Sequence, residues 1–176
     1  MKRFSFYAAI SILVLGHSVA GAQELERFVR YSQGDGEIHW GMVHGEEVYQ
    51  LAGAPYETME HTGAKFMRDE LRIEAPVDPN LVFMTALNFR SHITGEPAEY
   101  PGLFIVPASS IVGPEDAIVR PAESENLHYE AEMAIVVGKR AENVSIDEAH
   151  EYIFGVTAGN DVSERAWQSG DIQWVR

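Results

Sequence analysis

Two glutamates separated by a single residue are the part of this sequence best suited to chemistry. Glu130 and Glu132 lie in the run from His128 to Gly138, which is typical of a long strand. Residues two apart in a strand point to the same face, so their carboxylates are expected to be neighbours. Neighbouring carboxylates repel each other, and a cation between them removes that cost. The pair therefore predicts a site for Mg²⁺, Mn²⁺ or Ca²⁺, with a solvated strand face as the alternative.

Asp161 is a candidate third ligand. It follows a predicted strand from Ile153 to Thr157 and precedes a predicted helix from Val162 to Gln168. Ligands often lie where a strand ends and a helix begins in α/β proteins. The spacing of Asp161 and Glu164 also fits a capping box. The pattern leaves open whether Asp161 binds a cation or caps a helix.

His92 is a candidate proton-transfer group. It lies in a polar loop from Asn88 to Pro101, and Glu96 follows four residues later. A carboxylate beside an imidazole holds and polarises the ring, and such a pair can move protons near neutral pH. The ordinary alternative is a solvated loop histidine.

The elements that must position these residues are mostly short strands. Ahead of the candidate site, glycine turns separate β-rich runs that predict a small antiparallel meander: Arg27 to Tyr31, Ile38 to Val43 and Val48 to Leu51. A charged linker, Lys65 to Pro76, follows, and a domain boundary is expected near Asp78-Pro79.

Closer to the glutamates, apolar runs from Leu81 to Met84 and from Leu103 to Val106 are typical of buried strands. The strand after Glu132 also becomes apolar, which predicts that it passes into a core. Ser145 to Tyr152 has helical spacing and begins with a capping-box pattern. These patterns favour a mainly β protein with few helices, of the α+β class.

The first 22 residues are typical of an export signal. Lys2 and Arg3 precede an apolar run that ends at Leu15, and small residues precede the expected cleavage after Ala22. The run is shorter than the roughly 20 residues that span a bilayer. We therefore expect a periplasmic or secreted protein with no membrane association after cleavage, divided into domains at residues 23–78 and 79–176.

Composition narrows the partners. The formal charge of the whole chain is −14, and loss of two basic residues with the signal makes it more negative. An acidic surface repels phosphate backbones, so nucleic acid is not an expected partner. The sequence has no cysteine. Any metal must therefore be bound by oxygen or histidine.

Several motifs in order resemble the fumarylacetoacetate hydrolase family over roughly Leu81 to Arg176. Tyr129 to Met133, followed by Val136 to Lys139, is similar to the family's glutamate-pair strand. Gly159 to Gln168 is similar to its Asn-Asp-Val-Ser-x-Arg-x-x-Gln segment. The resemblance implies a mixed β-roll, here incomplete at its C-terminus and preceded by the meander.

The resemblance also implies residue roles. Glu130, Glu132 and Asp161 match the protein ligands of a Mg²⁺ or Mn²⁺ ion. Arg165 and Gln168 match positions that face the substrate. His92 matches the proton-transfer histidine, with Glu96 as its partner or, because the family spacing is slightly shorter, Glu99 instead.

The implied activity is hydrolysis of a small 2-oxo or enol carboxylic acid, with C–C cleavage through a metal-stabilised enolate. An isomerase, hydratase or decarboxylase of the same family shares that enolate and is an alternative. Two departures matter: Val106 stands where many relatives have lysine, and the sequence stops after Gln173 to Arg176, before a family lysine segment. We therefore expect a fragment of a longer, dimeric parent enzyme, and a non-catalytic periplasmic binding module or inactive fragment is the alternative from another class.

Overall fold

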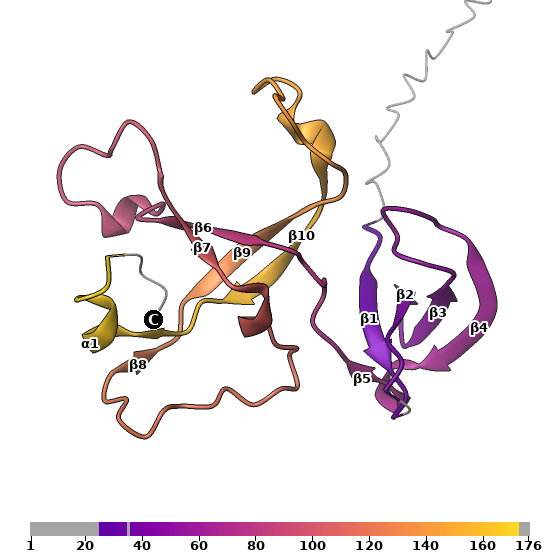
Figure 1. Cartoon of the computed structure of the whole chain (residues 1–176). Coiled ribbons are helices and arrows are strands. Elements are labelled where there is room, and N and C mark those ends of the chain that lie inside the picture. The colour runs from indigo at the N-terminus through magenta and orange to yellow at the C-terminus, as the bar shows by residue number, and fades with distance from the viewer. Residues whose placement is uncertain (1–24, 35, 173–176) are drawn as a thin grey trace, which may run out of the picture.

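The computed structural model describes residues 25–34 and 36–172. The expected signal segment and the final residues, Gln173 to Arg176, lie outside the described residues. Figure 1 shows two parts side by side, a small N-terminal sheet and a more open group of ribbons that carries the candidate site. None of the helices in the described ranges is long and apolar enough to cross a membrane.

The N-terminal part is one antiparallel sheet whose strand order is β4-β3-β2-β1-β5. Its strands are β1 (Phe28–Ser32), β2 (His39–His44), β3 (Glu47–Leu51), β4 (His61–Met67) and β5 (Arg72–Ile73), with the short 3-10 helix η1 (Arg68–Glu70) before β5. The tight turn between β2 and β3 uses Gly45 at φ +59°, a left-handed conformation that favours glycine. The predicted meander is confirmed by β1, β2 and β3.

A compact apolar core lies on one face of this sheet. Tyr31, Val48 and Leu71 are its buried members, at 0%, 0% and 6% exposure. Partly buried apolar side chains surround them: Val29, Val43, Phe66 and Ile73. The β-branched and aromatic residues that favour strands here also supply the burial that stabilises the sheet.

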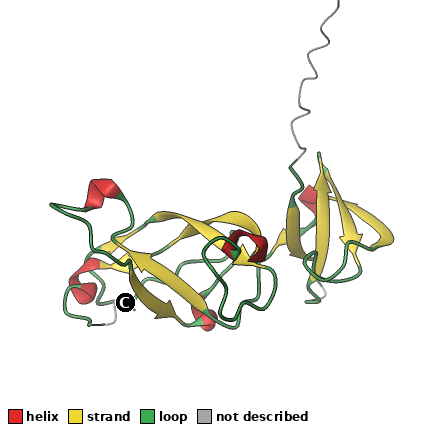
Figure 2. Ribbon diagram, turned by 90° about the horizontal axis from the view of Figure 1, so that it is seen from above, coloured by secondary structure: helices red, strands yellow, loops and turns green. Residues whose placement is uncertain are grey.

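The second part consists of three two-stranded antiparallel ribbons. The pairs are β6 (Val82–Ala86) with β7 (Gly102–Val106), β9 (Ala131–Val137) with β10 (Ile153–Asn160), and β8 (Leu127–His128) with β11 (Ser163–Glu164). Short helices follow or join them: η2 (Arg90–His92), η3 (Ala108–Ser110), η4 (Ala149–Tyr152) and α1 (Arg165–Gln168). Figure 2 shows these ribbons crossing one another beside the N-terminal sheet.

An aromatic cluster joins the two parts. The Phe154 ring of β10 lies 5.5 Å from the Phe28 ring of β1 and 5.6 Å from the Tyr56 ring, measured between centroids. Gly138 packs beneath this cluster, where a Cβ would lie 2.6 Å from Phe154 Cβ. The same Cβ would lie 3.3 Å from Tyr56 Cβ, so the absence of a side chain at Gly138 allows both Phe154 of β10 and Tyr56 to pack closely against it.

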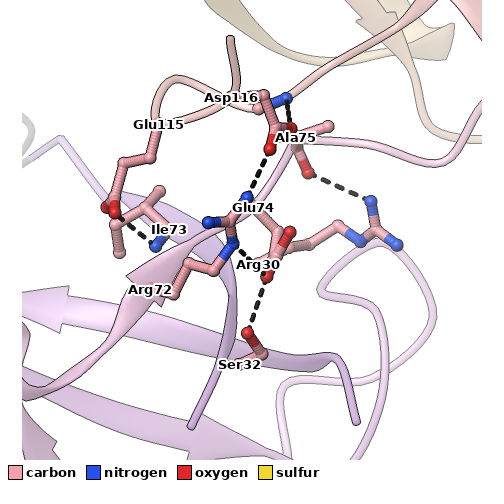
Figure 3. Close-up of polar contacts among 9 residues, drawn as sticks. Arg30, Ser32, Arg72, Ile73, Glu74, Ala75, Glu115 and Asp116 are labelled. Carbon is pink, nitrogen blue, oxygen red and sulfur yellow. Dashed lines mark hydrogen bonds and ion pairs between the residues drawn. The ribbon is translucent and has the colours of Figure 1, made fainter. Parts of the chain in front are cut away.

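A polar cluster joins the same two parts at β5 (Figure 3). The Arg72 guanidinium donates to the Asp116 carboxylate and forms an ion pair with Glu74 at 3.3 Å. The backbone N–H of Ile73 donates to Glu115 at 3.1 Å. These contacts hold the turn at residues 113–116 against the end of the sheet.

Three sequence expectations about elements were wrong. The charged linker from Lys65 to Pro76 contains the end of β4, η1 and β5, because backbone pairing of β4 with β3 and of β5 with β1 overrides its polar composition. The helix expected from Ser145 to Tyr152 is a turn followed by η4, although Glu148 does accept a hydrogen bond from Ser145 Oγ at 2.6 Å. The strand expected from His128 to Gly138 is interrupted between β8 and β9.

The expectation of buried strands around the site was also wrong for this chain. Strands β6, β7, β9 and β10 each have a half-buried face and an exposed face. Large apolar side chains lie on the exposed faces, among them Phe83 at 63%, Leu103 at 62% and Met133 at 68% exposure. Each ribbon has only two strands, so the described residues cover one face of these strands and leave the other to solvent.

Candidate carboxylate site

The hairpin of β9 and β10 brings the three predicted ligands to one end of a ribbon. Glu132 lies opposite Gly159, and Ala131 lies opposite Asn160. The Asp161 N–H donates to the Glu130 carbonyl at 2.9 Å, and the Glu130 N–H donates to Asn160 Oδ1 at 3.1 Å. Antiparallel pairing therefore places Asp161 beside Glu130, thirty-one positions earlier in the chain.

The two glutamates share the half-buried face of this strand, as their spacing predicts. Burial raises the pKa of Asp161 above its ordinary value, and the charges of Glu130 and Glu132 raise it further. The Arg165 guanidinium opposes this rise in the Asp161 pKa. Glu130 and Glu132 thus lie close enough to disfavour the charge of Asp161, which is the electrostatic setting that a cation relieves.

Arg165 binds one of these carboxylates directly. Its Nη2 lies 2.8 Å from Glu130 Oε1, and its Nη1 donates to Gln168 Oε1 at 2.7 Å. Ser163 Oγ also donates to Glu130 Oε1, at 3.1 Å. The two predicted substrate-facing residues, Arg165 and Gln168, therefore lie together at the carboxylate site.

The donor set has the right chemistry for a hard divalent cation, since all three candidate ligands are carboxylates. In this conformation, no group of three or more His, Asp or Glu side chains in the described ranges converges closely enough to hold a metal ion. The Glu130 carboxylate instead binds Arg165 and Ser163. Both donors bind the same oxygen, Glu130 Oε1, so a three-carboxylate site requires the carboxylates to come closer together but does not require the contact with Arg165 to break.

The structure does not bring together His92 and Glu96. His92 ends η2, its ring packs 5.9 Å from the Phe89 ring, and its side chain is exposed. Within residues 25–34 and 36–172, no hydrogen bond or ion pair joins His92 to Glu96 or to Glu99. The loop is held instead by Arg90, which donates to the Gly95 carbonyl at 2.9 Å.

Asp161 does not cap the final helix. The N-cap of α1 is Glu164, whose side chain accepts a hydrogen bond from the Ala166 N–H. Residues 163 and 164 pair with β8, so the helix begins three residues later than predicted. Ser163 and Glu164 are the site residues that sequence reasoning missed. One indication of a role for Glu164 was present in the sequence, its capping-box spacing from Asp161. That pattern predicted Asp161 as the N-cap and Glu164 as its partner, whereas Glu164 is itself the N-cap.

Two hollows in the described surface lie away from the carboxylates. One, of about 230 Å³, lies between the two parts of the molecule and is lined by residues that include Arg30, Asp78 and Asp116. The other is lined by His44, Tyr49, His61, Gly63 and Ala64 on the N-terminal sheet. Neither contains a predicted site residue.

Comparison with known families identifies the family of this chain. Residues 81–176 match the fumarylacetoacetate hydrolase C-terminal family, and residues 26–76 match the Rv2993c-like N-terminal family. The first match alone covers more than half of the chain. The chain therefore belongs to the fumarylacetoacetate hydrolase family, and the predicted family and its mainly β fold are confirmed.

Relatives in the family are enzymes with different reactions. The chain is 34% identical to Protein Rv2993c of Mycobacterium tuberculosis, over 84% of this chain and 56% of that protein. It is 33% identical to mitochondrial oxaloacetate tautomerase fahd2 of Xenopus laevis, over 74% and 42%. It is 41% identical to caffeoylpyruvate hydrolase of Neonothopanus nambi, over 50% and 33%. The chain thus spans between about a third and slightly more than half of the length of these relatives.

Solved structures share the same fold. The 2-hydroxyhepta-2,4-diene-1,7-dioate isomerase of Mycobacterium marinum superimposes with a TM-score of 0.77 at 33% identity, over 86% of this chain and 60% of that one. Maleylpyruvate hydrolase of Sphingobium sp. SYK-6, solved with manganese and pyruvate, gives a TM-score of 0.62 at 22% identity, over 80% and 60%. At that identity the second likeness shows the fold alone.

Proposed function

We propose that this chain carries the carboxylate-ligand part of a divalent-metal-dependent hydrolase that cleaves a C–C bond in a 2-oxo or enol carboxylic acid. The observation that carries the proposal is the cluster of Glu130, Glu132 and Asp161, which backbone pairing brings together and in which burial, and then the two glutamate charges, raise the pKa of Asp161. Related proteins named as hydrolases and tautomerases of oxo acids support the substrate class.

In this proposal, Glu130, Glu132 and Asp161 hold Mg²⁺ or Mn²⁺. A divalent cation there supplies Lewis acidity toward the substrate oxygens. Arg165, held beside Glu130, would bind the substrate carboxylate through its remaining N–H donors. Gln168, which already contacts Arg165, would keep that guanidinium oriented.

Proton transfer is assigned to His92, with Glu96 as its orienting partner. An imidazole suits this role because its ordinary pKa lies near neutrality. The two side chains are apart in the present structure, so their pairing requires the loop from Asn88 to Pro101 to reorganise. Hydrogen-bond distances at catalytic groups commonly shorten only when substrate is bound.

The first test is calorimetric titration of the chain with Mn²⁺ and with Mg²⁺. We expect about one ion per chain, and we expect binding to disappear in a Glu130→Ala, Glu132→Ala double variant. A matched control is Glu57→Ala, Glu60→Ala, which removes two exposed carboxylates from the N-terminal part. Equal binding by both double variants would contradict the assigned ligands.

A second test separates the reactions. Acylpyruvates, 2-hydroxy-dienedioates and oxaloacetate should be offered to the chain with Mn²⁺, and loss of substrate followed by absorbance. Turnover of acylpyruvates supports hydrolysis, whereas conversion of the other two supports an isomerase, tautomerase or decarboxylase.

A non-catalytic binding module is the second candidate, and the exposed apolar faces of β6, β7 and β9 favour it for this chain. Metal binding without turnover of any of these substrates would support that candidate. Export and dimerisation of the parent are part of the proposal as well. N-terminal sequencing of protein recovered from the periplasm should begin at Gln23, and an intact Met1 would contradict export.

A further inference from the structure

Glu164 is a buried carboxylate beside the candidate site, with 4% of its surface exposed. Its Oε2 accepts hydrogen bonds from Ser124 Oγ and from the Asn126 N–H, the latter at 2.9 Å. Its Oε1 accepts a hydrogen bond from the Ala166 N–H at 3.1 Å. In the described residues no cation pairs with Glu164, so neutral donors alone stabilise its charge.

These bonds connect two segments that lie far apart in the sequence. Ser124 and Asn126 begin the segment that leads through β8 to Glu130, and they lie 40 and 38 residues from Glu164. The direct ladder between β8 and β11 has only two residue pairs. The Arg165 N–H adds one bond, to the Asn126 carbonyl at 2.9 Å. The Glu164 carboxylate therefore adds two hydrogen bonds across a short ladder, at the end of the segment opposite to Glu130.

A simple helix cap does not account for this arrangement. The helix that Glu164 caps has only four residues, and two of the three donors belong to the other segment. The Ser124 hydrogen bond is the largest of the effects that lower the pKa of Glu164, and burial opposes them. Hydrogen bonds to an ionised acceptor are stronger than those between neutral groups.

Glu164 lies between Ser163 and Arg165 in the sequence, and both of these neighbours contact Glu130. Ser163 donates to Glu130 Oε1, and Arg165 forms an ion pair with the same oxygen. We propose that Glu164 is a positioning residue that holds Ser163 and Arg165 against Glu130 and thereby sets the geometry of the carboxylate site. Its effect on metal uptake rests on the proposed function, whereas its effect on Arg165 does not.

The test compares Glu164→Gln and Glu164→Ala with a matched control. Gln keeps the volume of Glu164, but its amide places two donors where three donors already converge. The control is Glu148→Gln, because Glu148 also accepts a bond from a nearby serine, Ser145, yet is exposed and remote from the site in sequence. Amide spectra of β9 and β10 report whether each variant keeps the fold of the part that carries the site.

Two readouts follow Arg165 and the metal separately. Without metal, the NMR signals of the Arg165 guanidinium should be sharp in the parent chain and should broaden in both Glu164 variants. With Mn²⁺, titration followed by electron paramagnetic resonance should show a dissociation constant about 10- to 100-fold larger in the Glu164 variants than in the parent chain. Losses of this size are typical when a residue that supports a metal ligand is replaced. The spectrum of the bound ion should also change.

The outcomes distinguish the two proposals. If the parent chain takes up no Mn²⁺, the proposed metal function fails, and the Arg165 signals alone decide the role of Glu164. Unchanged Arg165 signals in Glu164→Gln would overturn the positioning role. Unchanged Mn²⁺ affinity and spectrum in a folded variant would overturn it equally. If Glu164→Ala unfolds, Glu164→Gln and Ser124→Ala supply the same comparison.

Discussion

The two parts of this molecule are built from similar short strands, but they bury very different amounts of apolar surface. Every hydrophobic side chain that counts as buried among the described residues belongs to the N-terminal part: Tyr31, Met42, Val48, Leu51, Ala54 and Leu71. The part that carries the candidate site has none in residues 79–172. A five-stranded sheet that curves over one face makes its own core, whereas separate two-stranded ribbons do not.

This contrast separates stability from function. The N-terminal sheet has a core but none of the predicted site residues. The ribbons hold those residues through backbone pairing and polar contacts around Glu130 and Glu164. Isolated two-stranded ribbons are marginally stable in water, so the geometry of the site depends on such local links.

The largest expected effect on stability comes from comparing a leucine in the N-terminal core with a leucine on an exposed strand of the second part. Leu71→Ala removes a side chain that is 6% exposed in the core, and it should lower the free energy of unfolding by about 2–5 kcal/mol. Leu103→Ala, at 62% exposure on β7, should change it by less than about 0.5 kcal/mol. Urea unfolding measures both. Equal losses would show that the exposed face of β7 is covered in solution.

A smaller effect is expected where the two parts meet. Phe154→Ala removes ring contacts with Phe28 and Tyr56, each worth about 0.5–1.5 kcal/mol beyond area burial. Small-angle X-ray scattering should then show a larger radius of gyration, because the two parts move more independently. Phe83→Ala is the control, since that ring is 63% exposed. An unchanged radius of gyration would mean that the polar cluster at β5 holds the two parts together without the aromatic contacts.

The ion pair between Arg72 and Asp116 should contribute less. Its side chains are 47% and 33% exposed, so Arg72→Ala should cost about 0.2–1 kcal/mol and the cost should shrink as salt rises. Arg140→Ala is a suitable control, because Arg140 pairs with Glu142 at 88% and 67% exposure. Denaturant titrations at two salt concentrations check this. A cost that does not depend on salt would argue against an electrostatic origin.

The smallest expected effect is on the stability of the N-terminal sheet at acid pH. Hydrogen bonds from Lys65, and then from Tyr49, lower the pKa of Glu47 below 4.5. A lowered carboxyl pKa stabilises the fold at pH values above the unfolded pKa, and the stabilisation disappears as pH falls through the folded pKa. Glu47→Gln should therefore reduce the acid sensitivity of the N-terminal sheet slightly, whereas Glu46→Gln should not. Identical urea midpoints in the acid range would refute this.

The sequence by itself determined the family, the strands β1, β2, β3, β6, β7 and β10, and the shared face of Glu130 and Glu132. Those features depend on local patterns: turn glycines, β-branched runs and the two-residue period of a strand. The sequence left open whether Asp161 binds a cation or caps a helix. Antiparallel pairing of β9 with β10 places Asp161 beside Glu130, which favours the first of these roles.

Tertiary structure alone decided the rest. The composition of the linker gives no indication of β4 and β5, because these strands are defined by backbone pairing with β3 and with β1 in the folded sheet. Alternation in β9 predicts two faces but not whether anything covers the apolar one. The link from Glu164 to Ser124 and Asn126 joins residues about 40 positions apart, and only the folded chain brings such donors to a buried carboxylate.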